Sequence, residues 1–331
     1  MIALYNPFQK FLFDNNTCFL SGTPLLSAEE KIHVFPVWLM QAYQLEDKPF
    51  KLLDESITTY KKLQLPCSTA VANRIALLEE EVEAAFNQGV EGVKQLDKLI
   101  LFQWIGKLIY GIIFNEIQVG LRQQQMSGEP MNFSQVLGKK FTNLHLMLQS
   151  IIRPMLFEVS APYSINVFEL ATDQNGFSYR DEINTLVFSL RINNIGIVAC
   201  LQDNGANDKY HEEQLTQVSN EQLHPIQFEE ICGLYFYSAY LFNRLPEYTV
   251  LTTEDCIYIE PMPLRGMDSR PIFDNFQVKT YGQVLENFWK PWGYTLFEII
   301  KDPEHPMSFL WDAQGNFRQA ASIPLADKYL D

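Results

Sequence analysis

Four side chains in the first 80 residues are of the types that bind metals and transfer protons. Cys18 and Cys67 each begin a short turn-like segment, but neither has a second cysteine three positions later. His33 lies between them, and Glu79 follows the second one. A structural zinc site takes four Cys or His ligands, commonly from two Cys-x-x-Cys turns. The spacing is therefore that of a zinc site that has kept half of its ligands.

His33 opens the string His-Val-Phe-Pro-Val-Trp and is the candidate general base. A histidine can take a proton from a water near neutral pH, and a divalent metal can stabilise a scissile phosphate. Such a metal needs oxygen ligands, because hard cations prefer carboxylates. Glu30 and Glu79 are the carboxylates that could hold it, with Glu29 beside the first, whereas Ile32 supplies no ligand atom.

The order of these motifs resembles that of a bacterial branch of the HNH (His-Asn-His) endonucleases. That pattern runs C-x-x-C, then E-H-[VI]-F-P-x-W, then L-P-C-x-x-C-N-N-x-x-L-S-x-L-E, and an apolar helix follows. The likeness covers residues 18–117, where Leu65-Pro66-Cys67 and Glu79 fall on matching positions. The resemblance implies a nuclease module in which His33 activates water and a bound Mg, Mn or Zn ion stabilises the phosphate.

The departures from this pattern fall on the residues that carry the chemistry. Ser21 and Ala70 replace two cysteines, Ile32 replaces the acidic residue before the histidine, and Val71-Ala72 replaces the Asn-Asn pair. We therefore expect a degenerate, non-catalytic HNH-like protein that acts as a binding or interaction module. No cofactor is expected, Cys18 and Cys67 are vestigial ligands, and His33 braces its turn instead of acting as a base.

Two alternatives remain open at this stage. In the first, the chain is an active metal-dependent HNH endonuclease with His33 as general base and a metal held by Glu30 or Glu79. A cluster of His33 with two carboxylates would favour it. In the second, the C-terminal part binds a peptide or a small ligand, and a large apolar pocket around residues 163–260 would favour that hypothesis.

Charge is unevenly distributed along the 331 residues, whose formal net charge is −15. Residues 161–331 contain 11 basic and 24 acidic side chains, whereas residues 101–160 contain 5 and 3. An acidic surface repels phosphate, so nucleic acid is expected to bind only through the N-terminal half. The five scattered cysteines are unlike a disulfide framework, and no secretory signal is recognisable at the start. A reducing cytoplasm is the expected compartment.

The segment 99–117 is apolar enough to be mistaken for a membrane span, but Lys107 lies at its centre. A central lysine costs about 2.5–3.5 kcal/mol on insertion. We therefore expect a buried helix over 96–121 and no membrane contact. This helix joins the N-terminal module to the rest of the chain or makes a homodimer contact.

Periodicity predicts an α+β fold with antiparallel hairpins in its C-terminal part. The expected parts are a degenerate HNH-like module (1–95), a helical connection (96–155) and an acidic α+β domain (156–331). Helices are predicted from about residue 36, over 65–87, 96–121, 133–152 and 226–243. Strands are predicted over 163–171, 183–192, 195–202, 249–260 and 292–300, with a last hairpin over 308–319.

Overall fold

The computed structural model describes residues 4–27, 30–128, 133–265 and 270–324. Helices and mainly antiparallel sheets are mixed along the chain, so the predicted α+β class is confirmed. Two compact units form. Unit 1 comprises residues 1–87, 96–160 and 247–262, and unit 2 comprises residues 88–95, 161–246 and 263–331. The three-part division expected from the sequence remains a prediction about folding domains.

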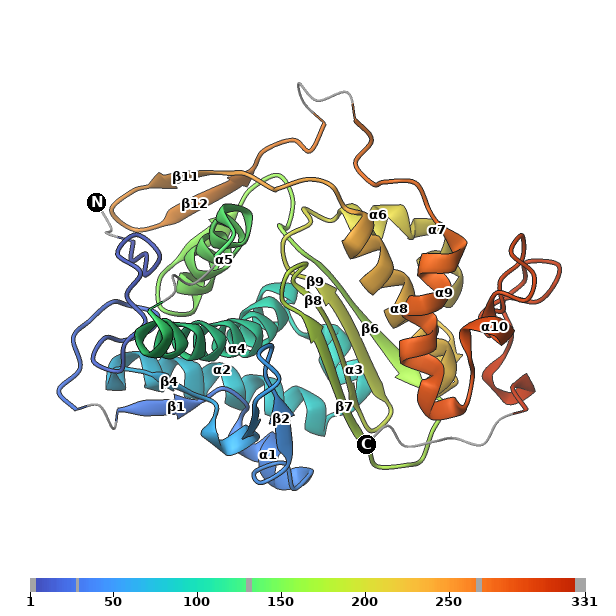
Figure 1. Ribbon diagram of the computed structural model, residues 1–331, viewed down its shortest axis with the longest axis horizontal. Coiled ribbons are helices and arrows are strands. Elements are labelled where there is room, and N and C mark those ends of the chain that lie inside the picture. Colours follow the sequence, from blue (N-terminus) through green and yellow to red (C-terminus); the bar gives the residue numbers. More distant parts are fainter. Residues whose placement is uncertain (1–3, 28–29, 129–132, 266–269, 325–331) are drawn as a thin grey trace. The chain divides into compact units, whose positions relative to one another are not determined.

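Unit 1 combines four helices with three small sheets (Figure 1). The helices are α1 (Val37–Ala42), α2 (Thr69–Asn87), α4 (Lys98–Ser127) and α5 (Gln135–Leu148), with 3₁₀ turns η1 (Tyr60–Lys62) and η2 (Gln149–Ile151). Antiparallel pairs join β1 (Lys31–His33) to β4 (Gln64–Pro66) and β2 (Pro49–Lys51) to β3 (Ile57–Thr59). The third sheet has the order β11 (Tyr248–Thr252), β12 (Ile257–Pro261), β5 (Met155–Phe157).

Helix α4 is the central element of unit 1. Its first turn is capped by Asp97, whose side chain accepts a hydrogen bond from the Leu99 amide at 2.8 Å. The helix ends at Gly128, which has a left-handed backbone with φ of 76°. It packs against α2 and α5. The length and composition would allow a membrane span, yet most of the apolar stretch is buried inside the protein.

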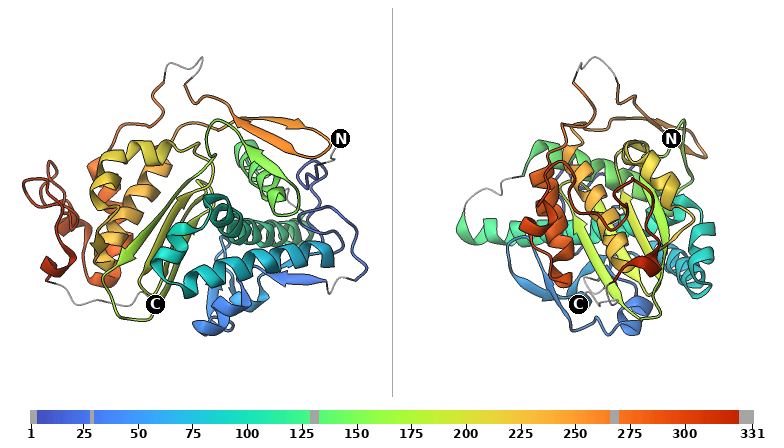
Figure 2. Two further views of the ribbon diagram at one scale, coloured as in Figure 1. Left: turned by 180° about the vertical axis from the view of Figure 1, so that it is seen from behind. Right: turned by 90° about the vertical axis from the view of Figure 1, so that its right-hand side faces the viewer.

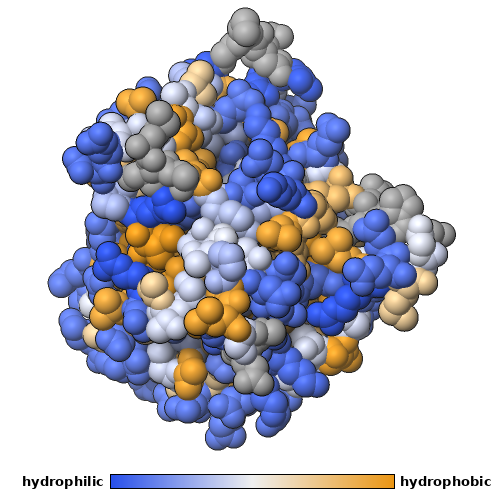
Figure 3. Space-filling model, turned by 90° about the vertical axis from the view of Figure 1, so that its left-hand side faces the viewer, coloured by the Kyte–Doolittle hydropathy of each residue, from blue (hydrophilic) through white to orange (hydrophobic). Residues whose placement is uncertain are grey.

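The burial expected for this helix is confirmed. Leu101, Ile105, Ile109 and Ile112 are all buried. On the face drawn in Figure 3, hydrophobic residues form separate small groups among hydrophilic ones. The homodimer contact suggested for 96–121 remains a prediction.

Unit 2 is built on a five-stranded sheet with the order β10-β6-β9-β8-β7. The strands are β6 (Ser164–Leu170), β7 (Phe177–Glu182), β8 (Val187–Ile192), β9 (Ile195–Cys200) and β10 (Gln222–Leu223), and only β10 runs parallel to its neighbour. The helices are α3 (Val90–Gln95), α6 (Ala206–Tyr210), α7 (Glu212–Val218), α8 (Pro225–Leu241), α9 (Val278–Trp289) and α10 (Leu296–Ile299), with 3₁₀ turns η3 (Lys290–Trp292) and η4 (Ala320–Ser322).

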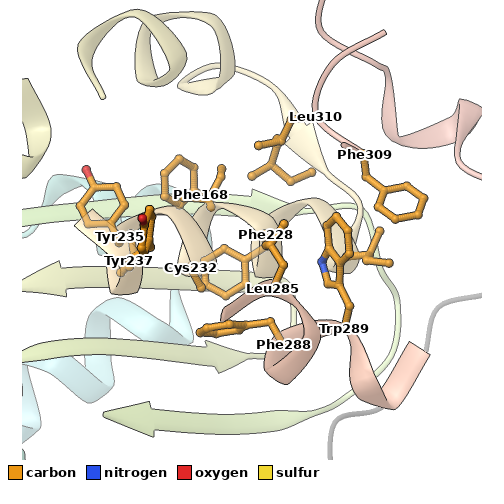
Figure 4. Close-up of a cluster of buried hydrophobic side chains, with 14 of the residues drawn as sticks. Phe168, Phe228, Cys232, Tyr235, Tyr237, Leu285, Phe288, Trp289, Phe309 and Leu310 are labelled. Atoms are coloured by element: carbon orange, nitrogen blue, oxygen red, sulfur yellow. The ribbon is translucent and has the colours of Figure 1, made fainter. Parts of the chain in front are cut away.

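Helix α8 lies on one face of this sheet, and α9 packs against α8 on the same side (Figure 2). Gly196 of β9 leaves room for the Phe228 ring of α8 because it has no side chain. A Cβ at this position would lie 2.6 Å from the Phe228 ring. Figure 4 shows the aromatic core that results, with Phe228 and Phe288 between the helices and the strands.

Some predicted strands need correction. The turn at Asn193-Asn194 is confirmed between β8 and β9, and Asn193 has φ of 53°. Strand β7, which was not predicted from the sequence, lies between the predicted strands 163–171 and 183–192 along the chain, and β6 pairs with β9. The strand predicted over 292–300 is wrong. Thr295 and Glu298 form a reciprocal capping box there, which starts α10.

Candidate functional site

Cys18 lies in a tight turn formed by residues 17–24. Its amide donates to the Thr23 carbonyl oxygen at 2.8 Å, and the Gly22 amide donates to the Cys18 carbonyl oxygen at 3.0 Å. Gly22 has φ of 72°, a conformation that favours glycine. A Cβ at Gly22 would lie 2.3 Å from the Tyr5 ring, so the turn leaves no room for another side chain.

Cys67 lies against this turn, directly after β4. The Phe19 amide donates to the Pro66 carbonyl oxygen at 2.8 Å and ties the two segments together. The Cys67 thiol donates to the Ser68 carbonyl oxygen at 3.6 Å, and Ser68 Oγ donates to Cys18 Sγ at 3.7 Å. Cys18 and Cys67 therefore lie together beside Ser68, close enough for each thiol to shift the pKa of the other.

The surroundings shift the pKa values of the two thiols in opposite directions. The contact with Cys67 lowers the pKa of Cys18 most, burial opposes this, and contacts with Ser21 and the Ser68 backbone lower the pKa further. The contact with Cys18, together with burial, raises the pKa of Cys67. Cys18 is therefore the more acidic of the two thiols. The hydroxyl group of Ser21, which replaces a cysteine of the motif, donates to Thr23 Oγ1 at 2.9 Å.

Apolar side chains of the same segments are buried, and Ser68 brings a polar donor to Cys18. Trp38 is half-buried, and the fully buried residues are Phe19, Leu20, Val34, Phe35, Leu65 and Ile75. Each fully buried side chain of this size contributes about 1.5–3 kcal/mol. Packing on this scale can hold the two turns together without a metal.

His145 of α5 is a buried histidine that the sequence did not single out. Its Nε2 lies 2.8 Å from the Phe19 carbonyl oxygen, which fixes Nε2 as the donor. Burial lowers the pKa of His145 to about 4, so the ring is neutral at pH 7. Its ring also packs edge-on against Tyr5 at 5.5 Å. This histidine anchors the Cys18 turn to α5.

His33 ends β1, where it lies opposite Gln64 of β4. Its side chain is partly exposed, and Nδ1 is buried with no hydrogen-bond partner among the described residues. Ile32 precedes it in the same strand, opposite Leu65, so the strand presents no carboxylate next to the histidine. The main chain of His33 has a defined role instead, because its carbonyl oxygen accepts a hydrogen bond from Lys107.

Lys107 of α4 contacts several of the segments that form this site. Its Nζ donates to the carbonyl oxygens of His33 and Val34 and to Glu79 Oε1, each at 2.7 Å. The lysine side chain is 1% exposed and that of Glu79 is 21% exposed. A buried ammonium is costly unless it is paired and hydrogen-bonded, and here three oxygens meet that need. One lysine therefore links α4, α2 and the end of β1.

The local sequence of α4 explains how this lysine is positioned. Residues 107, 111 and 115 lie on one face of a helix because they are four apart. Gly111 lets Val34 approach, since a Cβ there would lie 2.7 Å from a Val34 methyl group. Asn115 Nδ2 then donates to the Gln64 carbonyl oxygen at 3.1 Å. A polar stripe on a mostly apolar helix thus holds the β1–β4 pair.

The carboxylates proposed as metal ligands have other partners. Glu79 is paired with Lys107, and Glu30 Oε1 accepts the amides of Leu26 and Ser27 at 3.0 and 3.1 Å. Glu29 lies outside the described residues. Within the described ranges, no group of three or more His, Cys, Asp or Glu side chains is placed to hold a metal. The structure therefore brings Cys18 together with Cys67, and the His33 main chain together with Glu79 through Lys107.

Comparison with protein-family models found no match, and searches of curated proteins and of solved structures found none either. The HNH resemblance therefore rests on the motif residues alone. Of the residues that shape this site, Lys107 gave a signal in the sequence, as a charge inside an apolar helix. His145 gave none, because a histidine in an amphipathic helix is common.

Proposed function

We propose that this chain is a degenerate HNH-like protein whose N-terminal module acts in binding and does not cleave phosphodiesters. The observation that carries the proposal is the contact of Lys107 Nζ with three oxygens at 2.7 Å, one of them from Glu79. In the active-nuclease alternative, Glu79 would hold a divalent metal. An ammonium at this carboxylate neutralises it and repels a second cation.

The state of the other motif residues supports the same proposal. Glu30 holds its own loop through two backbone amides, and Ile32 supplies no ligand. Cys18 and Cys67 lie together, and each is hydrogen-bonded to Ser68. The scaffold of a metal-dependent module is thus maintained by hydrogen bonds and packing within the chain.

A row of apolar side chains supports a protein as the partner. Leu156 lies opposite Tyr258, and Tyr258 lies opposite Leu251, across the three strands of the β11-β12-β5 sheet. Leu156 and Leu251 are 54% and 61% exposed, whereas Ile257 and Ile259 on the other face are buried. Strand β11 contains no charged residue, and no described strand pairs with its outer edge. Such exposed apolar rows at a strand edge fit a protein contact.

Cleavage of supercoiled plasmid tests the catalytic part of the proposal. The full chain is incubated with Mg²⁺, Mn²⁺ or Zn²⁺ beside the His33→Ala variant, purified identically. We expect the two proteins to show the same background nicking. Cleavage by the wild type that disappears in His33→Ala would refute the proposal and establish the nuclease alternative.

The hypothesis of ligand binding by the C-terminal part called for a large apolar pocket around residues 163–260. A cavity is present in unit 2, but it is small and lined by charged as well as apolar groups.

A further inference from the structure

A small cavity lies between the sheet of unit 2 and the helices that cover it. Its lining includes Ser178 and Arg180 of β7, Ser189 and Arg191 of β8, Glu229 of α8 and Phe288 of α9. In the described conformation it has room for about one water molecule. None of these residues belongs to the N-terminal site.

The strand register places four polar side chains on the face that α8 covers. Arg180 lies opposite Ser189, and Ser178 lies opposite Arg191, so all four point to one side of the sheet. Covered sheet faces are normally apolar, and the same face carries Val198 in the hydrophobic core. Two arginines at such positions break the usual pattern, and breaks of this kind concentrate at functional sites.

Glu229 faces the cavity with one oxygen that the protein leaves unsatisfied. The residue is 3% exposed, and its Oε2 accepts the indole N–H of Trp292 at 3.0 Å. Oε1 is buried and has no hydrogen-bond partner among the described residues. A buried carboxylate oxygen without a partner is costly, so an occupant of the cavity is needed to satisfy it.

Two arginines and a single carboxylate line this cavity. The Arg180 guanidinium stacks over the Phe288 ring at 4.4 Å from its centroid. Arg191 is 3% exposed, its Nε donates to the Asn193 carbonyl oxygen, and its Nη2 donates to Thr172 Oγ1 at 3.4 Å. The arginines thus bring two positive charges to a lining in which Glu229 is the one carboxylate.

We propose that this cavity binds a single anion close to a water molecule in size, such as chloride. Arg180 and Arg191 supply the charge, the hydroxyl groups of Ser178 and Ser189 supply donors, and protonated Glu229 donates from Oε1. Binding thus satisfies the oxygen that is otherwise unpaired.

The environment of Glu229 favours this protonated form. Burial raises its pKa to about 8, while the charges of Arg180 and Arg191 and the Trp292 hydrogen bond oppose the rise. The remaining titratable group on this lining, the Cys232 thiol of α8, is neutral at pH 7 because burial raises its pKa. Anion affinity should therefore weaken as the pH rises through about 8.

The indole N–H of Trp292 reports directly on Glu229 and can be followed by ¹H–¹⁵N NMR in the full chain labelled at tryptophan. Sodium chloride is titrated, with the ionic strength held constant by a bulky sulfonate buffer. We expect a saturable shift of the Trp292 resonance with chloride. Arg180→Gln should weaken this binding by about tenfold or more, because it removes one charge.

Arg318→Gln is the matched control, since Arg318 also lies over an aromatic ring, that of Phe309 at 5.8 Å, but outside the cavity. It should bind as the wild type does. A Trp292 resonance that does not respond to chloride, or a response unchanged in Arg180→Gln, would overturn the proposal and leave water as the occupant.

A second variant covers the case in which Arg180→Gln does not fold. Glu229→Gln keeps an acceptor for Trp292 and offers an amide donor that does not titrate. Its anion affinity should be independent of pH, whereas the affinity of the wild type falls between pH 7 and about 9. Equal pH dependence in the two proteins would contradict the assignment of Glu229.

Discussion

At the scale of single residues, Lys107 forms an ion pair with Glu79, the carboxylate that a catalytic metal would need as a ligand. Lys107 is buried and has three oxygen partners, from Glu79, His33 and Val34. Removing one member of a buried pair is strongly destabilising, because the other is left without compensation. The lysine should therefore be required for the fold of unit 1.

Lys107→Met tests this requirement. The variant leaves Glu79 and two carbonyl oxygens without their partner, so the free energy of unfolding should fall by about 3–5 kcal/mol. Urea denaturation at pH 7 measures it. Glu91→Gln is the control, because Glu91 pairs with Lys94 at 3.9 Å on the surface, where such pairs contribute about 0–1 kcal/mol. Equal effects of the two substitutions would contradict the structural role of Lys107.

Glu229 gives a prediction about pH. Its pKa is raised to about 8 in the folded protein from an ordinary value near 4.5, so between these pH values the folded state holds a proton that the unfolded state releases. Stability must then fall as the pH rises through this window, by up to about 1.4 kcal/mol per pH unit. Glu229→Gln removes this dependence. The difference in thermal stability between Glu229→Gln and the wild type should therefore grow in favour of the variant from pH 5 to pH 8. A difference that stays constant over this range would refute the prediction.

The sequence revealed part of this chemistry. The types and spacing of Cys18 and Cys67 predicted that they would approach each other, and Lys107 was conspicuous inside an apolar helix. Its partners were not predictable, because Glu79 and His33 lie 28 and 74 positions away. Contacts over such separations depend on how helices and strands pack, which local patterns do not encode.

At the scale of elements, α4 organises unit 1 through one polar stripe. Gly111 is the tightest point of that stripe, because Val34 packs where a side chain would begin. In an exposed helix, replacing glycine by alanine stabilises by about 1 kcal/mol. Here Gly111→Ala should instead destabilise by about 1–3 kcal/mol through overpacking. Chemical denaturation decides the sign, and a gain in stability would show that the Val34 contact is not tight.

Long helices were the elements that the sequence predicted best, because α2, α4 and α8 carry apolar residues at helical spacing over many turns. The order of the strands was not predictable. Strand β6 pairs with β9, the third strand after it along the chain, and not with β7, the strand that follows it directly. The segment 292–300 has strand-like composition, yet the capping box of Thr295 and Glu298 directs it into α10. A capping box at the N-terminus of a short helix can thus override a weak strand-like sequence pattern.

At the scale of the whole molecule, the chain carries a formal net charge of −15, which disfavours non-specific binding to phosphate backbones. Together with the pairing of Lys107 with Glu79, this charge is consistent with the proposed binding role without cleavage of nucleic acid. We expect the two cysteine segments to be held together by Ser68, His145 and the buried apolar side chains around them, without a metal.

Zinc content measured together with the effect of chelation tests this claim most directly. Protein purified without added metal is analysed for zinc, and its thermal unfolding is followed with and without a strong chelator. We expect no stoichiometric zinc and the same unfolding temperature in both samples. A structural zinc contributes about 10–16 kcal/mol of apparent binding free energy. About one zinc per chain, with loss of the fold on chelation, would show that a metal holds these segments together.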